Sequence, residues 1–114
     1  MHLSDCIFCK IAKKELPADI VYESDRIVAF KDIKPVMPVH VLVIPKSHIP
    51  SVDNLEDKDR ELLGELFLVA SKIAREQGVA ERGYRLVFNV GRDAGQTVDH
   101  LHLHLLGGRK LPFA

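Results

Sequence analysis

The sequence lacks a net charge and a long apolar run. Its 16 Lys and Arg residues balance 16 Asp and Glu residues, so the formal net charge is zero. Because no basic field attracts a nucleic-acid backbone, we do not expect DNA or RNA binding as the main activity. No apolar run follows a basic start, and none approaches the ~18 residues that cross a bilayer. The sequence therefore predicts no export, no membrane partner and a cytoplasmic location.

Cysteine is also scarce, and the two that occur, Cys6 and Cys9, lie three residues apart. In a chain without an export signal, this pair indicates metal ligands, a redox pair or packing residues rather than a disulfide framework. The redox interpretation is the weakest, because no strand precedes the pair as it does in thioredoxin-like units. Metal ligation and plain packing both remain open.

The overall amino-acid composition is typical of a globular domain. Hydrophobic residues make up 46% of the 114 positions and charged residues 28%. A chain of this length can bury one core but not two, so we expect a single domain over residues 1–114.

The order of the expected elements predicts an α+β fold. In chain order they are a short helix over about 5–14, strands over 20–24, 27–32 and 39–45, an amphipathic helix over about 55–77, a strand over 84–90, a glycine-rich loop over 91–96 and a final strand that carries histidines. Asn54 is the expected cap of the long helix, and Gly78 is its expected stop. Such an order favours a helix packed on a largely antiparallel sheet.

The segment at residues 99–108, DHLHLHLLGG, contains three of the six histidines. Because strand side chains alternate, His100, His102 and His104 would share one face while the intervening leucines share the other. A single histidine on a strand is usually solvated or structural. Three in register favour metal binding or catalysis, since imidazole serves both near neutral pH.

Two earlier histidines, His40 and His48, indicate that the histidines form two groups. If the strand VHVLVIP pairs antiparallel with the histidine strand and His40 lies near His104, His48 is carried toward His100. The register then places His40 with His102 and His104 at one end, and His48 with His100 at the other. Two cysteines and two histidines make a closed tetrahedral zinc site. The candidate set is Cys6, Cys9, His48 and His100.

The row from His100 to Leu106 resembles the pattern His-φ-His-φ-His-φ-φ, with φ apolar, of the histidine triad (HIT) superfamily. The stretches IFCKI, ELPADIVYESDRIVAFKDIKPVMPVHVLVIPKSHI and FNVGRDAGQTVDHLHLHLLGGR are similar in order and spacing to its Hint branch, the histidine triad nucleotide-binding proteins. The resemblance implies a two-layer fold with an antiparallel sheet of about five strands, one long helix and a short N-terminal helix. It also implies a homodimer whose subunits extend the sheet, and a nucleotide cleft on the triad face.

The resemblance further implies a hydrolase of the purine nucleoside phosphoramidase type. His102 matches the nucleophile that attacks the α-phosphorus and forms a covalent nucleotidyl-histidine, from which water releases a nucleoside monophosphate such as AMP. His104 matches the group that contacts the phosphate oxygens or the leaving group, and His40 matches a supporting histidine. Thr97 matches a hydroxyl donor to the phosphate.

The other implied substrate contacts fall into three groups. The phosphate loop is Gly95, Gln96, Thr97 and Val98. Asn89 matches a phosphate-side or ribose-side contact, and Asp32 matches the carboxylate that accepts hydrogen bonds from the ribose hydroxyls. The apolar walls around the base are Ile7, Phe8, Ile11, Phe30, Ile33 and Leu42.

The Cys-x-x-Cys pair resembles that of zinc-containing members of this branch, and the resemblance thus implies a structural zinc ion on Cys6, Cys9, His48 and His100. No organic cofactor is expected. Two alternatives stay open: a dinucleoside polyphosphate hydrolase, and a nucleotide-sensing or scaffold protein whose turnover is incidental.

Overall fold

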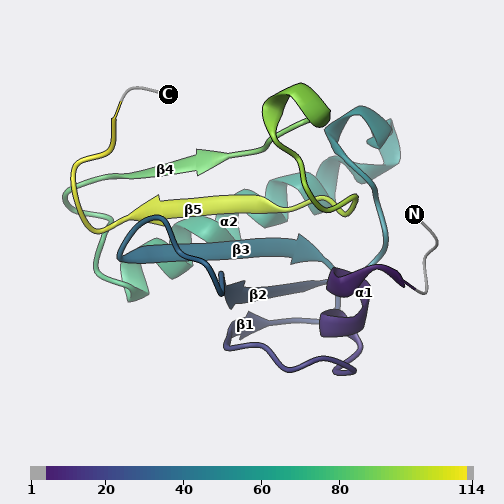
Figure 1. Ribbon diagram of the computed structural model, residues 1–114, viewed down its shortest axis with the longest axis horizontal. Helices are drawn as coiled ribbons and strands as arrows, with labels where there is room; N and C mark the ends of the chain where they lie inside the picture. Colours follow the sequence, from purple (N-terminus) through teal and green to yellow (C-terminus); the bar gives the residue numbers. More distant parts are fainter. Residues whose placement is uncertain (1–4, 113–114) are drawn as a thin grey trace.

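A single antiparallel sheet organises residues 5–112, which are the part of the chain that the computed structural model describes (Figure 1). The strands are β1 (Ile20–Glu23), β2 (Ile27–Lys31), β3 (Val39–Pro45), β4 (Tyr84–Val87) and β5 (Leu103–Gly107). Their order in the sheet is β1-β2-β3-β5-β4, and every neighbouring pair is antiparallel. The α+β architecture expected from the sequence is confirmed.

The long helix α2 (Arg60–Glu76) covers one face of the sheet and lies behind it in Figure 1. Its apolar positions recur every three or four residues, so one stripe faces the strands. Buried side chains on this face include Leu66, Ala70 and Ile73 of the helix, together with Val41 and Leu105 of the sheet. The leucines between the histidines belong to this core, as their alternation predicts. The described part of the chain holds no helix with the length and hydrophobicity needed to span a bilayer.

The short helix α1 (Ile7–Ala12) covers the opposite face. Its Phe8 and Ile11 pack against Phe30, Leu42 and a few further strand residues in a second core. The two cores separate because successive residues of β2 and β3 point to opposite faces. A helix of six residues is not stable by itself in water, so α1 depends on this packing and on the groups that hold its start.

The long helix begins five residues later than the sequence pattern predicts. Residues 52–54 and 57–59 form separate short 3₁₀ turns, so Asn54 does not cap α2. The Glu56 N–H donates to Asp59 Oδ2 at 2.9 Å, so these two acidic residues close the turn before the helix. The predicted end is within one residue, because Gly78 adopts a left-handed φ of 77° just beyond the cap.

The strand expectations need two larger corrections. β4 ends at Val87 instead of residue 90, and β5 starts at Leu103, so His100 and His102 precede the strand. The register is also two residues from the expected one, because His40 pairs with Leu106 rather than lying opposite His104. β3 ends at Pro45, and the Leu101 N–H donates instead to the carbonyl of Ile49 at 2.6 Å. The other predicted boundaries differ by one or two residues, and β3 matches.

Candidate active site and metal centre

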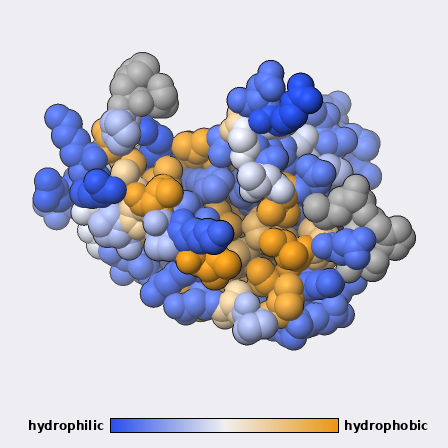
Figure 2. Space-filling view, viewed as in Figure 1, coloured by the Kyte–Doolittle hydropathy of each residue, from blue (hydrophilic) through white to orange (hydrophobic). Residues whose placement is uncertain are grey.

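A cavity of about 590 Å³ opens on the α1 face of the sheet. This volume suits a small organic ligand such as a nucleotide. Figure 2, viewed from the same side as Figure 1, shows apolar side chains gathered where α1 lies. The lining residues are Ile7, Phe8, Ile11, Leu16, Pro17, Ala18, Phe30, Lys31, Asp32, Ile33, Lys34, Leu42, Thr97, Val98, His102 and His104. The cavity is thus lined mainly by apolar side chains, with a few polar and charged groups among them.

Most of the residues expected to contact substrate line this cavity, although they differ in how far they are exposed to solvent. Ile33 is 89% exposed and stands at the rim rather than in a wall. Four others are not among the lining residues: His40, Asn89, Gly95 and Gln96. His40 lies one layer further in, against His104.

Sequence reasoning missed five lining residues. Leu16, Pro17 and Ala18 follow α1 and add to the apolar lining, while Lys31 and Lys34 flank Asp32 in the sequence. The segment ELPAD lies between the expected helix over about 5–14 and the strand that starts at residue 20, and no role in the cavity was expected for it. Its apolar residues next to a proline were the available signal, since such a loop can pack over an adjacent face.

Gln96 holds the loop before the histidine row. Its Nε2 donates to the carbonyls of Pro50 at 2.7 Å and Val98 at 3.0 Å, and its Oε1 accepts from the Gly91 N–H at 3.0 Å. The side chain is therefore fully used within the protein. It positions the Thr97 and Val98 segment that borders the cavity.

His102 has one ring nitrogen held and the other free. Its Nδ1 lies 2.7 Å from the carbonyl oxygen of His100, which can only accept, so Nδ1 carries the proton. Nε2 then keeps its lone pair. Burial lowers the pKa of His102 and keeps the ring neutral, against smaller raising effects of that hydrogen bond and of Asp32. The edge of Phe8 packs on the ring at a centroid distance of 5.2 Å.

His104 has the opposite arrangement. The Val36 N–H donates to His40 Nδ1 at 3.2 Å, and His40 Nε2 donates to His104 Nδ1 at 3.0 Å. This chain leaves His104 with its proton on Nε2. Burial lowers the pKa of His104 to about 4, and it also lowers the pKa of His40, where Asp32 opposes the shift. The site thus pairs a lone pair on one imidazole with an N–H on the next.

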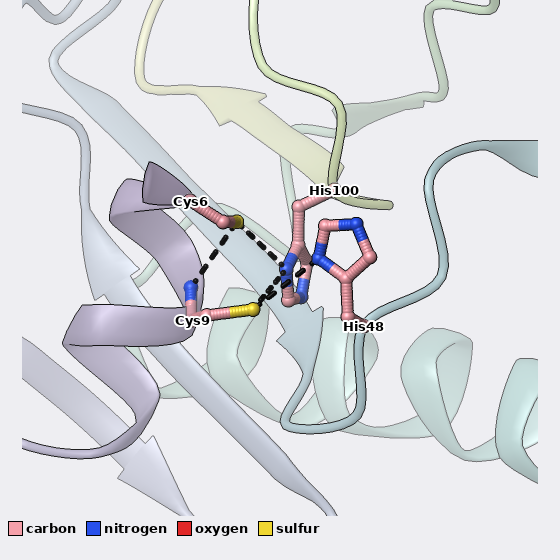
Figure 3. Close-up of side chains that lie close together, drawn as sticks. All are labelled: Cys6, Cys9, His48 and His100. Carbon is pink, nitrogen blue, oxygen red and sulfur yellow. Dashed lines mark hydrogen bonds between the residues drawn. The ribbon is translucent and has the colours of Figure 1, made fainter. Parts of the chain in front are cut away.

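Cys6, Cys9, His48 and His100 converge beside this cavity, as the sequence predicts (Figure 3). The Sγ of Cys6 lies 3.4 Å from His100 Nδ1, and the Sγ of Cys9 lies 3.2 Å from His48 Nδ1 and 3.5 Å from His100 Nδ1. Zinc bonds of about 2.3 Å to sulfur and 2.0 Å to nitrogen imply sulfur-to-nitrogen edges of roughly 3.5 Å in a tetrahedron. This set of ligands could hold a metal ion.

Hydrogen bonding around the four side chains also suits a cation. His100 Nε2 donates to the carbonyl of Pro45 at 2.8 Å, so the lone pair on Nδ1 faces the sulfur atoms. Two buried thiols and two imidazoles without a carboxylate are the ligands of closed, structural zinc sites.

A second group of possible ligands, Asp32, His40 and His104, has its donor atoms within 4.8 Å of one another. Here the Val36 N–H occupies the lone pair of His40 Nδ1, so His40 must keep its proton on Nε2, the atom that faces the group. An imidazole cannot bind a metal through a protonated nitrogen. The hydrogen bonds therefore disfavour a metal at this second position.

Comparison with known proteins agrees with this geometry. A family model described as "Scavenger mRNA decapping enzyme C-term binding" matches residues 5–111. A solved HIT family hydrolase from Legionella pneumophila is 50% identical, covers 96% of this chain and 97% of its own, and superposes with a TM-score of 0.94. The chain belongs to the histidine triad superfamily. A histidine triad protein from Clostridium difficile, 47% identical, superposes with a TM-score of 0.95 over 100% of this chain and 99% of its own.

Among curated relatives of this histidine triad protein is the purine nucleoside phosphoramidase of Escherichia coli strain K12. It is 49% identical over 107 residues, which are 94% of this chain and 90% of the relative. The match therefore spans both chains almost completely. In the triad itself the structure separates the row, because His100 lies with the cysteines while His102 and His104 line the cavity.

Proposed function

We propose that this protein is a purine nucleoside phosphoramidase, which hydrolyses the P–N bond at the α-phosphate and releases a nucleoside monophosphate such as AMP. The observation that carries the proposal is His102, a cavity-lining imidazole whose Nδ1–H is held by a carbonyl at 2.7 Å and whose Nε2 lone pair is free. The relative from Escherichia coli supports the substrate class. The alternatives of a dinucleoside polyphosphate hydrolase and of a scaffold have no comparable support.

The proposed reaction has two steps. The Nε2 lone pair of His102 attacks the α-phosphorus, a P–N bond to the enzyme forms, and the bond to the leaving nitrogen breaks. His104 donates a hydrogen bond from Nε2 to a phosphate oxygen or to the leaving nitrogen, where charge develops. Water then attacks the phosphorus and frees His102. Over both steps, one water supplies the hydroxyl of the monophosphate and the proton of the amine.

The substrate lies along the cavity in this proposal. The base packs between the apolar walls that Ile7, Phe8, Ile11, Phe30 and Leu42 form, with Ile33 at the rim. Asp32 accepts from the ribose hydroxyls, and its Oδ1 already accepts the Lys34 N–H at 2.8 Å, which orients the carboxylate. Thr97 and Val98 face the phosphate. Gly95, Gln96 and Asn89 act through the backbone or by shaping the loop, since they do not line the cavity.

Cys6, Cys9, His48 and His100 would hold a structural zinc ion in our proposal. Zinc bound there would cross-link α1 to the segments after β3 and before β5, a folding role rather than a catalytic one. The sulfur-to-nitrogen distances and the tautomer of His100 support this choice. The two free cysteines also fit a reducing, cytoplasmic environment.

We further propose a homodimer in which two sheets join at β4. This strand is at one edge of the sheet and so has unpaired backbone groups. Beside it, the exposed side chains of Phe67 and Leu68 project from α2, and Phe67 packs edge-on against Phe88 at 5.9 Å. Exposed apolar residues next to an open strand edge support an interface.

Turnover of adenosine 5′-phosphoramidate tests the proposed function. We expect AMP release by the wild-type protein, a nucleotidyl adduct on His102 by mass spectrometry after brief exposure, and no adduct or release with His102→Ala, which should still bind AMP. Arg60→Ala, an exposed change at the start of α2, is the matched control and should turn over normally. Normal turnover by His102→Ala would refute the mechanism.

A further inference from the structure

We propose that a second cavity, at the opposite end of the sheet from α1, binds a phosphoanhydride anion, of which pyrophosphate is the simplest example. The second cavity has a volume of about 280 Å³ and lies between the loop that joins α2 to β4 and the turn after β5. The end of α2, the start of β4 and the end of β5 lie together on the left side of Figure 1. The proposal goes beyond the phosphoramidase reaction, because the two cavities share no lining residue.

Positive charge gathers around the second cavity, although the chain as a whole has no net charge. Arg82 in the loop after α2 lines it together with Arg109 and Lys110 after β5, and no acidic residue does. Within residues 5–112, none of these three side chains forms an ion pair with a carboxylate. Three uncompensated cations repel one another, and a multivalent anion between them relieves that repulsion.

The backbone around the second cavity lets a ligand approach closely. Each arginine is next to a glycine with a positive φ, because Gly83 at 112° follows Arg82 and Gly108 at 101° precedes Arg109. Both glycines line the cavity and have no side chain to keep a ligand away. The two turns also pack together, since a Cβ added to the neighbouring residue 107 would lie 3.1 Å from the Cβ of Val79.

Arg109 is already held in place without a ligand. Its Nη2 donates to the carbonyl of Val36 at 3.2 Å. A guanidinium has five N–H donors, so most of them stay available for an anion. Because guanidinium groups bind phosphate oxygens through two parallel hydrogen bonds, two arginines and a lysine suit a ligand with more than one phosphoryl group.

The lining disfavours other classes of ligand. Val79 is the one lining residue with an apolar side chain, and no aromatic residue is among them. A nucleobase would therefore lack the apolar contacts that the cavity beside α1 offers. A metal cation would meet three positive charges and no carboxylate or thiol. A small polar anion is the class that remains.

The end of α2 opposes an anion only weakly. The carboxyl end of a helix carries about half an elementary negative charge. Here the N–H groups of residues 77–79 donate to carbonyls of the last helical turn, which satisfies those carbonyls. Glu76 and Glu81 are close in the sequence but do not line the cavity. Three full positive charges therefore outweigh the helix end.

Pyrophosphate is titrated by calorimetry into wild-type protein that is already saturated with AMP, so that the cavity beside α1 is occupied. We expect one pyrophosphate to bind per chain. In ¹⁵N–¹H NMR spectra, the amide signals of Gly83 and Gly108 should shift while that of His102 does not. No binding, or shifts confined to residues away from the second cavity, would overturn the inference.

Arg82→Gln combined with Lys110→Gln tests the charges while it leaves Arg109 and its hydrogen bond intact. We expect pyrophosphate binding weaker by about tenfold or more, because two of the three charge-assisted partners are lost. Lys58→Gln combined with Arg60→Gln is the matched control. It removes the same charge at the start of α2, a 17-residue helix and thus roughly 25 Å from the second cavity. This control should keep the wild-type affinity.

Equal weakening in both double variants would show that net charge alone attracts pyrophosphate, and the inference would fail. Should the Arg82 and Lys110 double variant not fold, the two single variants decide by the same criterion. Arg82→Lys combined with Lys110→Arg keeps every charge and should bind nearly as the wild type does.

Titrations with ATP and with inorganic phosphate, again beside saturating AMP, identify the source of the anion. ATP that binds as tightly as pyrophosphate would show that the terminal phosphates of a nucleotide suffice, whereas weaker ATP binding would indicate a free anion. Inorganic phosphate that binds as tightly as pyrophosphate would overturn the requirement for a phosphoanhydride. None of these results bears on the phosphoramidase proposal, which depends on turnover through His102.

Discussion

Backbone partners assign the ring protons of the two cavity-lining histidines. Burial keeps both rings neutral near pH 7, because it disfavours the charged imidazolium. The tautomer then follows from the partner. A carbonyl next to His102 requires a proton on Nδ1, whereas an amide next to His40 requires a lone pair there and passes the opposite tautomer to His104. Two neighbouring imidazoles thereby take different chemical roles.

The pH dependence of turnover follows from these shifts. Burial lowers the pKa of His104 to about 4, so that ring stays neutral well below the ordinary value of 6.5, and burial also lowers the pKa of His102 below that value. We expect the acid-side fall of kcat/KM for a phosphoramidate to lie below pH 6.5, where His102 loses its lone pair at a lowered pKa, and His104 to gain its second ring proton at a pH of about 4. Stopped assays of AMP release across this range measure it. A decline centred near pH 6.5 would contradict the burial argument.

At the scale of an element, the hydrophobic pattern predicts the bounds of a strand or helix well where residues such as proline stand at both ends. Residues 39–45 match β3, since a proline stands just before and another at the end. The start of β5 was not predictable in this way, because the alternation continues through His100 and His102 although the ladder with β3 begins only at the pair Val43 and Leu103. Pairing is a property of two strands, and one strand's pattern does not contain it.

The turn after β5 requires glycine at position 108. Gly108 has a φ of 101°, and an added Cβ would lie 2.8 Å from the Cβ of Pro38 in the loop before β3. We expect Gly108→Ala to lower the free energy of unfolding by about 1–3 kcal/mol, measured by urea denaturation.

Gly64→Ala is the matched control for this prediction. Gly64 lies on the exposed side of α2, and nothing stands within 4 Å of the added Cβ. The alanine should raise the free energy of unfolding by up to about 1 kcal/mol, because glycine is the poorer helix former. Equal effects of the two substitutions would show that the turn is not strained.

For the whole molecule, the two helices on opposite faces of the sheet divide the surface into two regions. The α1 face holds the cavity and the four side chains that could hold a metal ion, while α2 and the β4 edge form the region proposed for the dimer. Leu68, 72% exposed on α2, is the most exposed apolar residue of that region. Burying it would remove an unfavourable contact with water.

The dimer is testable through this residue. We expect sedimentation of the wild type as a dimer and of Leu68→Glu as a monomer, because a buried charge without a partner destabilises an interface. Val36→Glu introduces the same charge at another exposed apolar site, in the loop before β3, and should leave the dimer intact. A monomeric wild type, or a dimeric Leu68→Glu, would exclude this surface.

Local patterns in the sequence by themselves determined which residues are candidates for chemistry. The spacing of His100, His102 and His104, the pair Cys6 and Cys9, and the periodicity of α2 are all local, so the short-range geometry of strands and helices makes them readable. They predicted the fold class and the four metal ligands, although the register used to group those ligands was two residues off.

Tertiary packing decided the rest. Cys6 meets His100 across 94 positions of sequence, Leu16 to Ala18 line the cavity, and the carbonyl of His100 selects the tautomer of His102. Each of these depends on where two helices settle on opposite faces of one sheet and on which carbonyl or amide that packing brings within about 3 Å of a ring nitrogen. Such long-range distances follow from the packed core, and no local pattern contains them.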